Sequence, residues 1–304
     1  MNSSPSKNEA YKKYEFKKFC HIIGFKQREI MNLLTSIDKN YKEWSEVKED
    51  KTGKTKTYLD GTVKTRTFRN PSQLLKVVQK RIKNNIIDKI PLPDNIHGGV
   101  KKRSNITNAK AHQGNKYLFE TDLQEFYPNI NMASVYQTFN KLGYSTHISH
   151  WLTTLTTRKN ELPQGSPTST GISNLVFIQT DYKLIKLCKD HDITYTRYVD
   201  DLTFSSQQDF GHLVGEILNT VINDNFKISR RKTNYDGEQT VTGIKVLLNK
   251  IDAPQKILDK AKLEADSKAE IKPYTNYLNN IRKTNKKSKK PATNIGIPAS
   301  RSGR

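Results

Sequence analysis

The pattern of apolar and polar positions along the chain predicts a mixture of helices and short strands. From Glu9 to about Asn40, apolar residues recur at roughly helical spacing. Residues 42–69 change to Lys, Thr, Asp and Gly with turn signals, which predicts a twisted hairpin. Tyr195–Ser205 is typical of two short strands that meet at an acidic pair, and Tyr117–Asp122 of a third strand that ends on a carboxylate. We therefore expect an α+β protein.

The acidic pair Asp200-Asp201 at the expected hairpin turn is the first candidate for chemistry. Two carboxylates ~4 Å apart repel by about 4 kcal/mol at an effective dielectric near 20. A turn can tolerate this by pointing both groups into water, and Asp is a common turn residue. Asp122, at the end of another apolar strand, supplies a third acid. Three carboxylates on neighbouring strand ends predict a site for two Mg²⁺ ions and phosphoryl transfer to a growing nucleic-acid end.

Composition agrees with a polyanionic partner. The 304 residues hold 52 Lys plus Arg against 30 Asp plus Glu, a net charge of +22. Neutralised phosphates release condensed counterions, so such a surplus favours nucleic-acid binding. Cys20 and Cys188 are too few and too distant to indicate a disulfide framework or a zinc site. We see neither a membrane span nor a signal peptide and expect a cytoplasmic protein.

Five motifs in order carry a resemblance to a known family. Tyr198-Val-Asp-Asp201, the Asp122 strand and Leu162-Pro-Gln-Gly-Ser-Pro-Thr-Ser169 look like the palm motifs of reverse transcriptases. Asn108-Ala-Lys-Ala-His112 and Val241-Thr-Gly243 narrow the resemblance to the bacterial retron reverse transcriptases. The likeness runs from about residue 20 to about 250. It implies a right-hand polymerase with a ferredoxin-like palm, fingers and a short helical thumb.

This resemblance implies a division of the chain into regions. We expect an N-terminal helical segment at 1–40 and the palm at 116–128 and 171–240. The fingers would occupy 41–115, with part returning around 130–170. A primer-grip hairpin and the thumb would follow at 241–290. The basic tail at 291–304 is expected to be disordered, because residues 282–304 carry eight basic residues and no acid.

The resemblance also implies roles at the reaction centre. Asp122, Asp200 and Asp201 would hold two Mg²⁺ ions, with Mn²⁺ as a substitute. Tyr127, five positions after the first Asp, would pack under the deoxyribose and exclude a 2′-hydroxyl.

Four more residues are expected to bind the deoxynucleoside triphosphate. Arg66 is the first candidate for the triphosphate, because a guanidinium grips phosphate oxygens bidentately, and Lys64 is the second. Gln164 would hydrogen-bond the nucleotide or template. Lys232 would lie near the leaving pyrophosphate. Each of these basic residues could instead be an ordinary solvated charge.

Two groups of residues are candidates for contact with RNA. Lys101, Lys102 and Arg103, in a basic loop, could cradle a phosphate backbone. In retron enzymes the Asn108–His112 box is associated with the cognate RNA, and Val241, Thr242 and Gly243 form the second family box. Asn108 and His112 are four positions apart, hence on one helical face. A lone Asn or His is usually a satisfied structural group, so both interpretations of this box stay open.

The implied activity is RNA-directed DNA synthesis on a dedicated structured non-coding RNA. That RNA would serve as template and supply a 2′-hydroxyl primer, giving a branched RNA–DNA hybrid (msDNA) in antiphage defence, with an effector protein as a further partner. No RNase H acidic constellation is visible in the sequence, so a host RNase H would remove the template.

Three other classes remain as alternatives. A group II intron-type enzyme usually carries a longer maturase region than this chain offers. Another defence-associated reverse transcriptase would show the palm without the two retron boxes. A catalytically inactive RNA-binding module would have lost a carboxylate, and none is lost here.

Overall fold

The computed structural model describes residues 7–50, 52–58, 60–235, 239–267 and 270–285. Within them the helices are α1 (Lys7–Ile23), α2 (Gln27–Thr35), α3 (Gln73–Asn85), α4 (Asn105–Ala111), α5 (Phe126–Asn129), α6 (Met132–Lys141), α7 (Thr146–Thr156), α8 (Ser169–Asp190), α9 (Val214–Asn223), α10 (Gln255–Ala265) and α11 (Pro273–Lys283). The strands are β1 (Tyr41–Val47), β2 (Thr65–Pro71), β3 (Tyr117–Asp122), β4 (Thr194–Tyr198), β5 (Asp201–Ser206), β6 (Asn234–Tyr235), β7 (Thr240–Val241), β8 (Ile244–Val246) and β9 (Ile251–Asp252). The tail at 291–304 lies outside the described residues.

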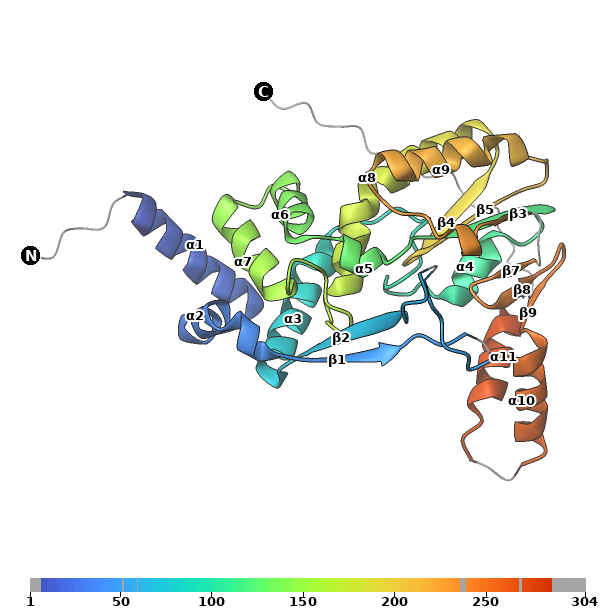
Figure 1. Cartoon of the computed structure of the whole chain (residues 1–304), viewed down its shortest axis with the longest axis horizontal. Helices are drawn as coiled ribbons and strands as arrows, with labels where there is room; N and C mark the ends of the chain where they lie inside the picture. The colour runs from blue at the N-terminus through green and yellow to red at the C-terminus, as the bar shows by residue number, and fades with distance from the viewer. Residues whose placement is uncertain (1–6, 51, 59, 236–238, 268–269, 286–304) are drawn as a thin grey trace, which may run out of the picture.

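A four-stranded antiparallel sheet forms the centre of the molecule. Its order is β4-β5-β3-β6, with α8 between β3 and β4 and α9 between β5 and β6. A β-α-β-β-α-β unit in this order has the ferredoxin-like topology, so the expected α+β class and ferredoxin-like sheet are confirmed. Helices α8 and α9 lie on one side of the sheet, and α4 lies on the other (Figure 1).

The largest core joins this sheet to the N-terminal helices. Helices α1, α2 and α3 pack around α7. Trp151 of α7 packs against two aromatic rings of α1, with its centroid 4.9 Å from that of Phe16 and 5.8 Å from that of Phe19. Because the apolar residues of α1 and α2 recur at helical spacing, each helix turns one face to this core. Within the described part of the expected N-terminal segment, α1 and α2 are helical, and residues 24–26 form a short break between them.

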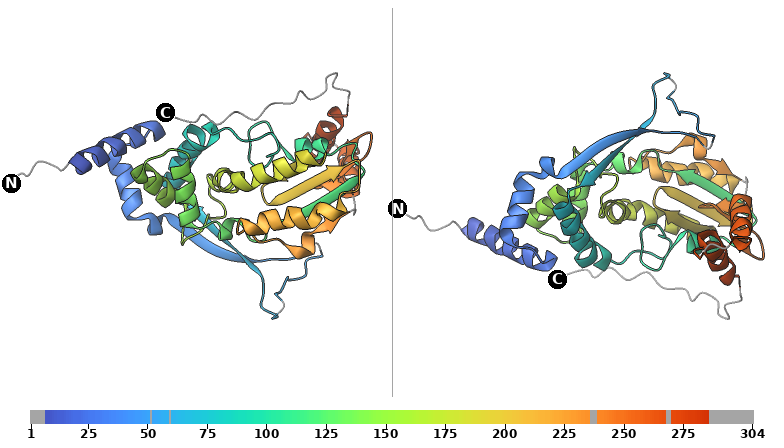
Figure 2. Two further views of the ribbon diagram at one scale, coloured as in Figure 1. Left: turned by 90° about the horizontal axis from the view of Figure 1, so that it is seen from above. Right: turned by 90° about the horizontal axis from the view of Figure 1, so that it is seen from below.

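A second, smaller core lies at the other end of the molecule. There the three-stranded sheet β7-β8-β9 and helices α10 and α11 enclose Val241, Ile244, Ile251 and Ile281. Figure 2 shows these elements at the opposite end from α1 and α2. Helix α4 joins the two cores, because Ala109 belongs to the second cluster while α4 also packs on β4.

The predicted twisted hairpin is present as a long ribbon. β1 and β2 pair antiparallel over seven positions, from Tyr41 opposite Pro71 to Val47 opposite Thr65. Beyond them, isolated bridges at Glu49–Thr55 and Thr57–Val63 extend the ribbon. The ribbon curves away from the helices and toward the sheet (Figure 2). Among the helices within the described ranges, none is long and apolar enough to cross a membrane.

Candidate active site

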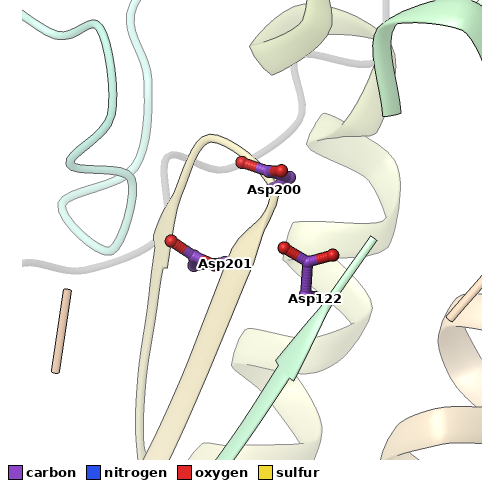
Figure 3. A group of neighbouring side chains, drawn as sticks. All are labelled: Asp122, Asp200 and Asp201. Carbon is purple, nitrogen blue, oxygen red and sulfur yellow. The ribbon is translucent and has the colours of Figure 1, made fainter. Parts of the chain in front are cut away.

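The strand register brings the three candidate carboxylates together. β3 pairs with β5 so that Asp122 lies directly opposite Asp201. β4 pairs with β5 with Tyr198 opposite Asp201, which leaves Val199 and Asp200 as a two-residue turn. One oxygen atom from each of Asp122, Asp200 and Asp201 lies within 4.8 Å of the others. Figure 3 shows Asp200 at the hairpin turn beside the end of the Asp122 strand.

Burial and mutual repulsion make this cluster electrostatically unfavourable without a cation. Burial raises the pKa of Asp201 to about 7, and the charges of Asp200 and Asp122 add to the shift. The pKa of Asp200 is raised as well, first by burial and then by the Asp122 charge. Lys232 donates to Asp122 Oδ2 at 2.5 Å and offsets part of this charge. Clustered carboxylate oxygens are the donors that hard divalent cations prefer, so these residues fit a Mg²⁺ site.

Lys232 is held by this carboxylate cluster. Burial lowers its pKa, but the hydrogen bond to Asp122 and the Asp122 charge outweigh it, so the pKa of Lys232 is raised overall. Its side chain nevertheless keeps 59% exposure. The ammonium therefore stays protonated and faces the open space in front of the cluster.

That open space is a cleft of about 1400 Å³ between the β1–β2 ribbon and the sheet. Asp122 and Asp200 line the cleft, and basic side chains from the ribbon and from residues 230–232 line it as well. The basic residues lining it are Lys48, Lys56, Lys64, Arg66, Arg230, Arg231 and Lys232. Tyr127 and Gln164 line the same cleft. All five predicted nucleotide-binding residues thus lie around one space, together with Asp122 and Asp200.

Tyr127 lies in the cleft with its hydroxyl fixed. The hydroxyl lies 2.8 Å from Thr170 Oγ1 in a hydrogen bond in which either can donate. Burial raises the pKa of this phenol. Its flat ring is therefore a neutral wall near Asp200, with the hydroxyl turned to the start of α8.

The Asn108–His112 box lies inside the protein. Asn108 is 0% exposed and His112 is 1% exposed. His112 Nδ1 and Nε2 lie 2.6 Å from Ser205 Oγ and Thr196 Oγ1. Burial and the neighbouring His97 lower the pKa of His112 to about 3, so its ring is neutral. The expectation that these two side chains touch RNA directly does not fit their burial. His112 ties the end of α4 to the central sheet, whereas Asn108 faces Thr242 in the turn between β7 and β8.

The second family box packs against the first. Val241 is fully buried, and the Asn108 Nδ2–Thr242 Oγ1 distance is 3.4 Å. Thr242 has a positive φ of 44°, and Gly243 follows at the exposed turn. Direct RNA contact by the Val241 side chain is therefore also inconsistent with its position. The two boxes form one interface between the central sheet and the β7–β9 sheet.

The basic loop divides into two kinds of residue. Lys101 and Lys102 are exposed, as a phosphate contact requires. Arg103 instead donates from Nη1 to the Pro93 and Ile96 carbonyls, at 2.5 and 2.7 Å, and pairs with Asp94. Because its guanidinium already serves the fold of its own loop, the expected phosphate contact does not fit Arg103.

Sequence reasoning missed Glu120, a fourth carboxylate near the cluster. Burial and the Asp201 charge raise its pKa to about 7. The period of two along β3 was the available signal, since Glu120 and Asp122 project from the same face of the strand. It also missed Arg197, whose side chain is fully buried behind the hairpin turn.

The sequence matches a known family over much of its length. Residues 50–246 match the family described as reverse transcriptase (RNA-dependent DNA polymerase). The chain belongs to this family, and its fold is the right-hand polymerase fold.

Curated proteins to which the chain is similar include bacterial retron reverse transcriptases. It is 32% identical over 197 residues to the retron Ec86 reverse transcriptase of Escherichia coli, covering 61% of this chain and 60% of that protein. It is 32% identical over 189 residues to the retron Se72 enzyme of Salmonella heidelberg (strain 579083-10), covering 62% of this chain but 47% of that protein. The chain thus spans about half the length of these relatives. A solved apo telomerase from Candida Tropicalis, truncated from its C-terminal domain, is 12% identical with a TM-score of 0.43 over 73% of this chain and 59% of that one, which adds nothing to the assignment.

Proposed function

We propose that this protein is an RNA-directed DNA polymerase that adds deoxynucleotides to a DNA 3′ end. The observation that carries the proposal is the cluster of Asp122, Asp200 and Asp201 at the edge of a basic cleft. Family membership supports the same reaction. Two Mg²⁺ ions, with Mn²⁺ as a substitute, would supply activation of the primer hydroxyl and neutralisation of the triphosphate charge.

The other cleft residues have roles that follow from their positions. Arg66, exposed on β2, and Lys64, before the strand, would grip the triphosphate from the ribbon side. Tyr127 would exclude a 2′-oxygen with its ring, and Gln164 would bond the base or template. Lys232 would exchange its bond to Asp122 for the leaving pyrophosphate, where its charge stabilises the negative charge that develops.

These assignments give each region a task. The palm would be 116–128 with 171–240, and the fingers 41–115 with a return around 130–170. Residues 241–290 would grip the primer and form the thumb. Lys101 and Lys102 remain candidates for the phosphate backbone, and the net charge of +22 supports nucleic-acid binding.

The similarity to retron enzymes supports a finer proposal. The template would be a cognate structured RNA that primes from its own 2′-hydroxyl, giving msDNA in the cytoplasm as part of antiphage defence. An effector protein would read the product, and a host RNase H would remove template RNA. A structured non-coding RNA encoded beside the gene would support this assignment, whereas intron domains would favour a group II intron-type enzyme.

The test of the reaction is the pair of variants Asp200→Asn and Asp201→Asn. Both should abolish primer extension while RNA binding in a gel shift stays near wild type, because RNA affinity rests on dispersed basic residues. Asp190→Asn, an exposed carboxylate at the end of α8, is the matched control and should extend normally. Wild-type extension by either cluster variant would contradict the metal assignment. An extension-deficient wild type that binds RNA would favour the inactive RNA-binding module.

A further inference from the structure

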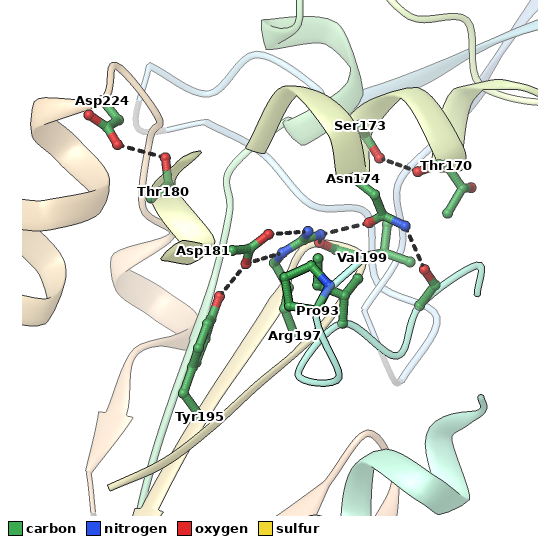
Figure 4. Close-up of polar contacts among 12 residues, drawn as sticks. Pro93, Thr170, Ser173, Asn174, Thr180, Asp181, Tyr195, Arg197, Val199 and Asp224 are labelled. Carbon is green, nitrogen blue, oxygen red and sulfur yellow. Dashed lines mark hydrogen bonds and ion pairs between the residues drawn. The ribbon is translucent and has the colours of Figure 1, made fainter. Parts of the chain in front are cut away.

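A buried polar network lies directly behind the Val199-Asp200 turn. The side chains of Arg197, Asp181 and Asn174 are all 0% exposed. Arg197 pairs bidentately with Asp181, with Nε–Oδ1 at 2.9 Å and Nη2–Oδ2 at 2.7 Å. Tyr195 donates its hydroxyl to the same carboxylate at 2.8 Å. Figure 4 shows the guanidinium between Asp181 and Asn174. The buried positive charge of Arg197 is thus paired with the Asp181 carboxylate, because an unpaired buried charge would be strongly destabilising.

The remaining arm of the guanidinium reaches the turn itself. Arg197 Nη1 donates to Asn174 Oδ1 and to the Val199 carbonyl, both at 2.9 Å. A lysine in this place could neutralise Asp181, but one ammonium has no rigid fork to reach the carboxylate and the turn together. The bonds from Nη1 therefore explain why this position holds an arginine and not only a positive charge.

The turn needs external support because of its backbone. Val199 has a positive φ of 61°. In a two-residue hairpin, a positive φ at the first central position usually requires glycine, and a β-branched residue is strained there. Such strained conformations persist at functional sites when surrounding contacts hold them.

The contacts on both sides of Asp200 fix its backbone. The peptide unit is planar, so holding the Val199 carbonyl also orients the Asp200 nitrogen. On the other side, the Asp200 carbonyl accepts from Leu123 N at 2.9 Å. Leu123 follows Asp122 directly. One hydrogen bond thus holds each of the two peptide units that flank Asp200: Arg197 binds the Val199 carbonyl, and Leu123 N binds the Asp200 carbonyl. Together they set the position of Asp200 relative to Asp122.

A loop on the outer side closes the same turn. Asn174 Nδ2 donates to the Gly98 carbonyl at 2.9 Å, and His97 N donates to the Arg197 carbonyl at 2.8 Å. A Cβ at Gly98 would lie 2.3 Å from Val199 N. Only glycine lets this loop approach so closely, so the turn is held between the loop and Arg197.

We propose that Arg197 is a positioning residue that, with Asn174 and the Gly98 loop, holds the strained Val199 turn so that Asp200 can share a divalent ion with Asp122. The inference rests on the proposed function of the three carboxylates. It goes beyond that function by assigning the placement of Asp200 to residues that do not line the cleft.

The experiment compares two variants that disturb the turn from opposite sides. Arg197→Lys keeps the charge beside Asp181 but removes the donor to Val199. Gly98→Ala leaves the ion pair intact and pushes on Val199 from the loop. Their matched controls are Thr180→Val and Gly215→Ala. The first removes the 2.7 Å hydrogen bond from Thr180 Oγ1 to Asp224 Oδ2. Thr180 directly precedes Asp181 in α8, so the change lies close to the network without touching Arg197. The second adds a Cβ where no atom lies within 4 Å.

Three readouts separate positioning from general stability. Mn²⁺ titration followed by electron paramagnetic resonance should show affinity about 10–100-fold weaker in Arg197→Lys and Gly98→Ala, the usual cost of losing support behind a metal ligand. Primer extension should need correspondingly more Mg²⁺ with an unchanged KM for nucleotide. Hydrogen exchange should accelerate at the amides of residues 199–202, while both controls stay near wild type.

Wild-type Mn²⁺ affinity and exchange in both turn variants would overturn the proposal, as would an equal shift in Thr180→Val. If Arg197→Lys does not fold, Gly98→Ala decides the question alone. Failure of the proposed function is distinguishable, because it would appear as a wild-type protein that extends no primer while the ion-binding and exchange readouts still compare the variants.

Discussion

Replacing Asp201 with Asn should stabilise the metal-free protein at high pH while removing its activity. The pKa of Asp201 is raised from 3.8 to about 7 by burial, then by the charges of Asp200 and Asp122. In the unfolded chain this carboxyl regains its ordinary pKa. Because the folded pKa is the higher one, the stabilising effect of the bound proton is fully present below about pH 4. It is lost as pH rises through about 7.

The magnitude follows from the shift. From 3.8 to about 7 is about 3 pKa units. At about 1.36 kcal/mol each, this corresponds to about 4 kcal/mol. That value is an upper limit, because Asp200 and Asp122 share the charge and can take up part of the proton. Asn is a neutral isostere of the protonated acid, so Asp201→Asn should retain this stability at pH 8.

The assay is thermal unfolding between pH 4 and 8 with a chelator present. The melting temperature of Asp201→Asn should exceed that of wild type by several degrees at pH 8, and the two should converge near pH 4. Added Mg²⁺ should raise the wild-type melting temperature more than that of the variant, because binding to the folded state alone stabilises it. Asp190→Asn serves as the control. A variant no more stable than wild type at pH 8 without metal would refute the reasoning.

Three further predictions concern other residues. Tyr127→Ala should let ribonucleotides compete with deoxyribonucleotides in extension assays, and unchanged sugar discrimination with preserved activity would place the barrier elsewhere. His112→Ala should cost about 1–3 kcal/mol in denaturant unfolding for each buried hydroxyl left unpaired, and an unaltered midpoint would contradict its structural role. Replacing Lys101 and Lys102 with Ala should flatten the salt dependence of RNA affinity, reducing its slope by about 0.7–0.9 for each phosphate that the variant no longer neutralises. An unchanged slope would remove both lysines from the interface.

The local pattern of the chain was enough to predict that Asp122, Asp200 and Asp201 lie together. Strand-prone residues predicted one strand that ends at Asp122 and two strands that meet at Asp200-Asp201. Antiparallel pairing of such strands brings these positions together. The order of motifs then indicated the family and the ferredoxin-like sheet. Both follow from sequence because strand ends and turn residues are defined by near neighbours along the chain.

Tertiary structure decided what covers each surface. The spacing of Asn108 and His112 placed them on one face of a helix, but no periodicity shows whether that face meets RNA or a sheet. α4 packs between β4 and the β7–β8 strands, so the face is buried. Arg197 was missed for the same reason. An arginine in a strand is usually exposed unless a buried partner pairs with it, and here that partner is Asp181, 16 positions away in the sequence. Sequence determined which groups stand at the turn; long-range packing determined how Asp200 is held there, because burial and charge pairing depend on residues distant in sequence.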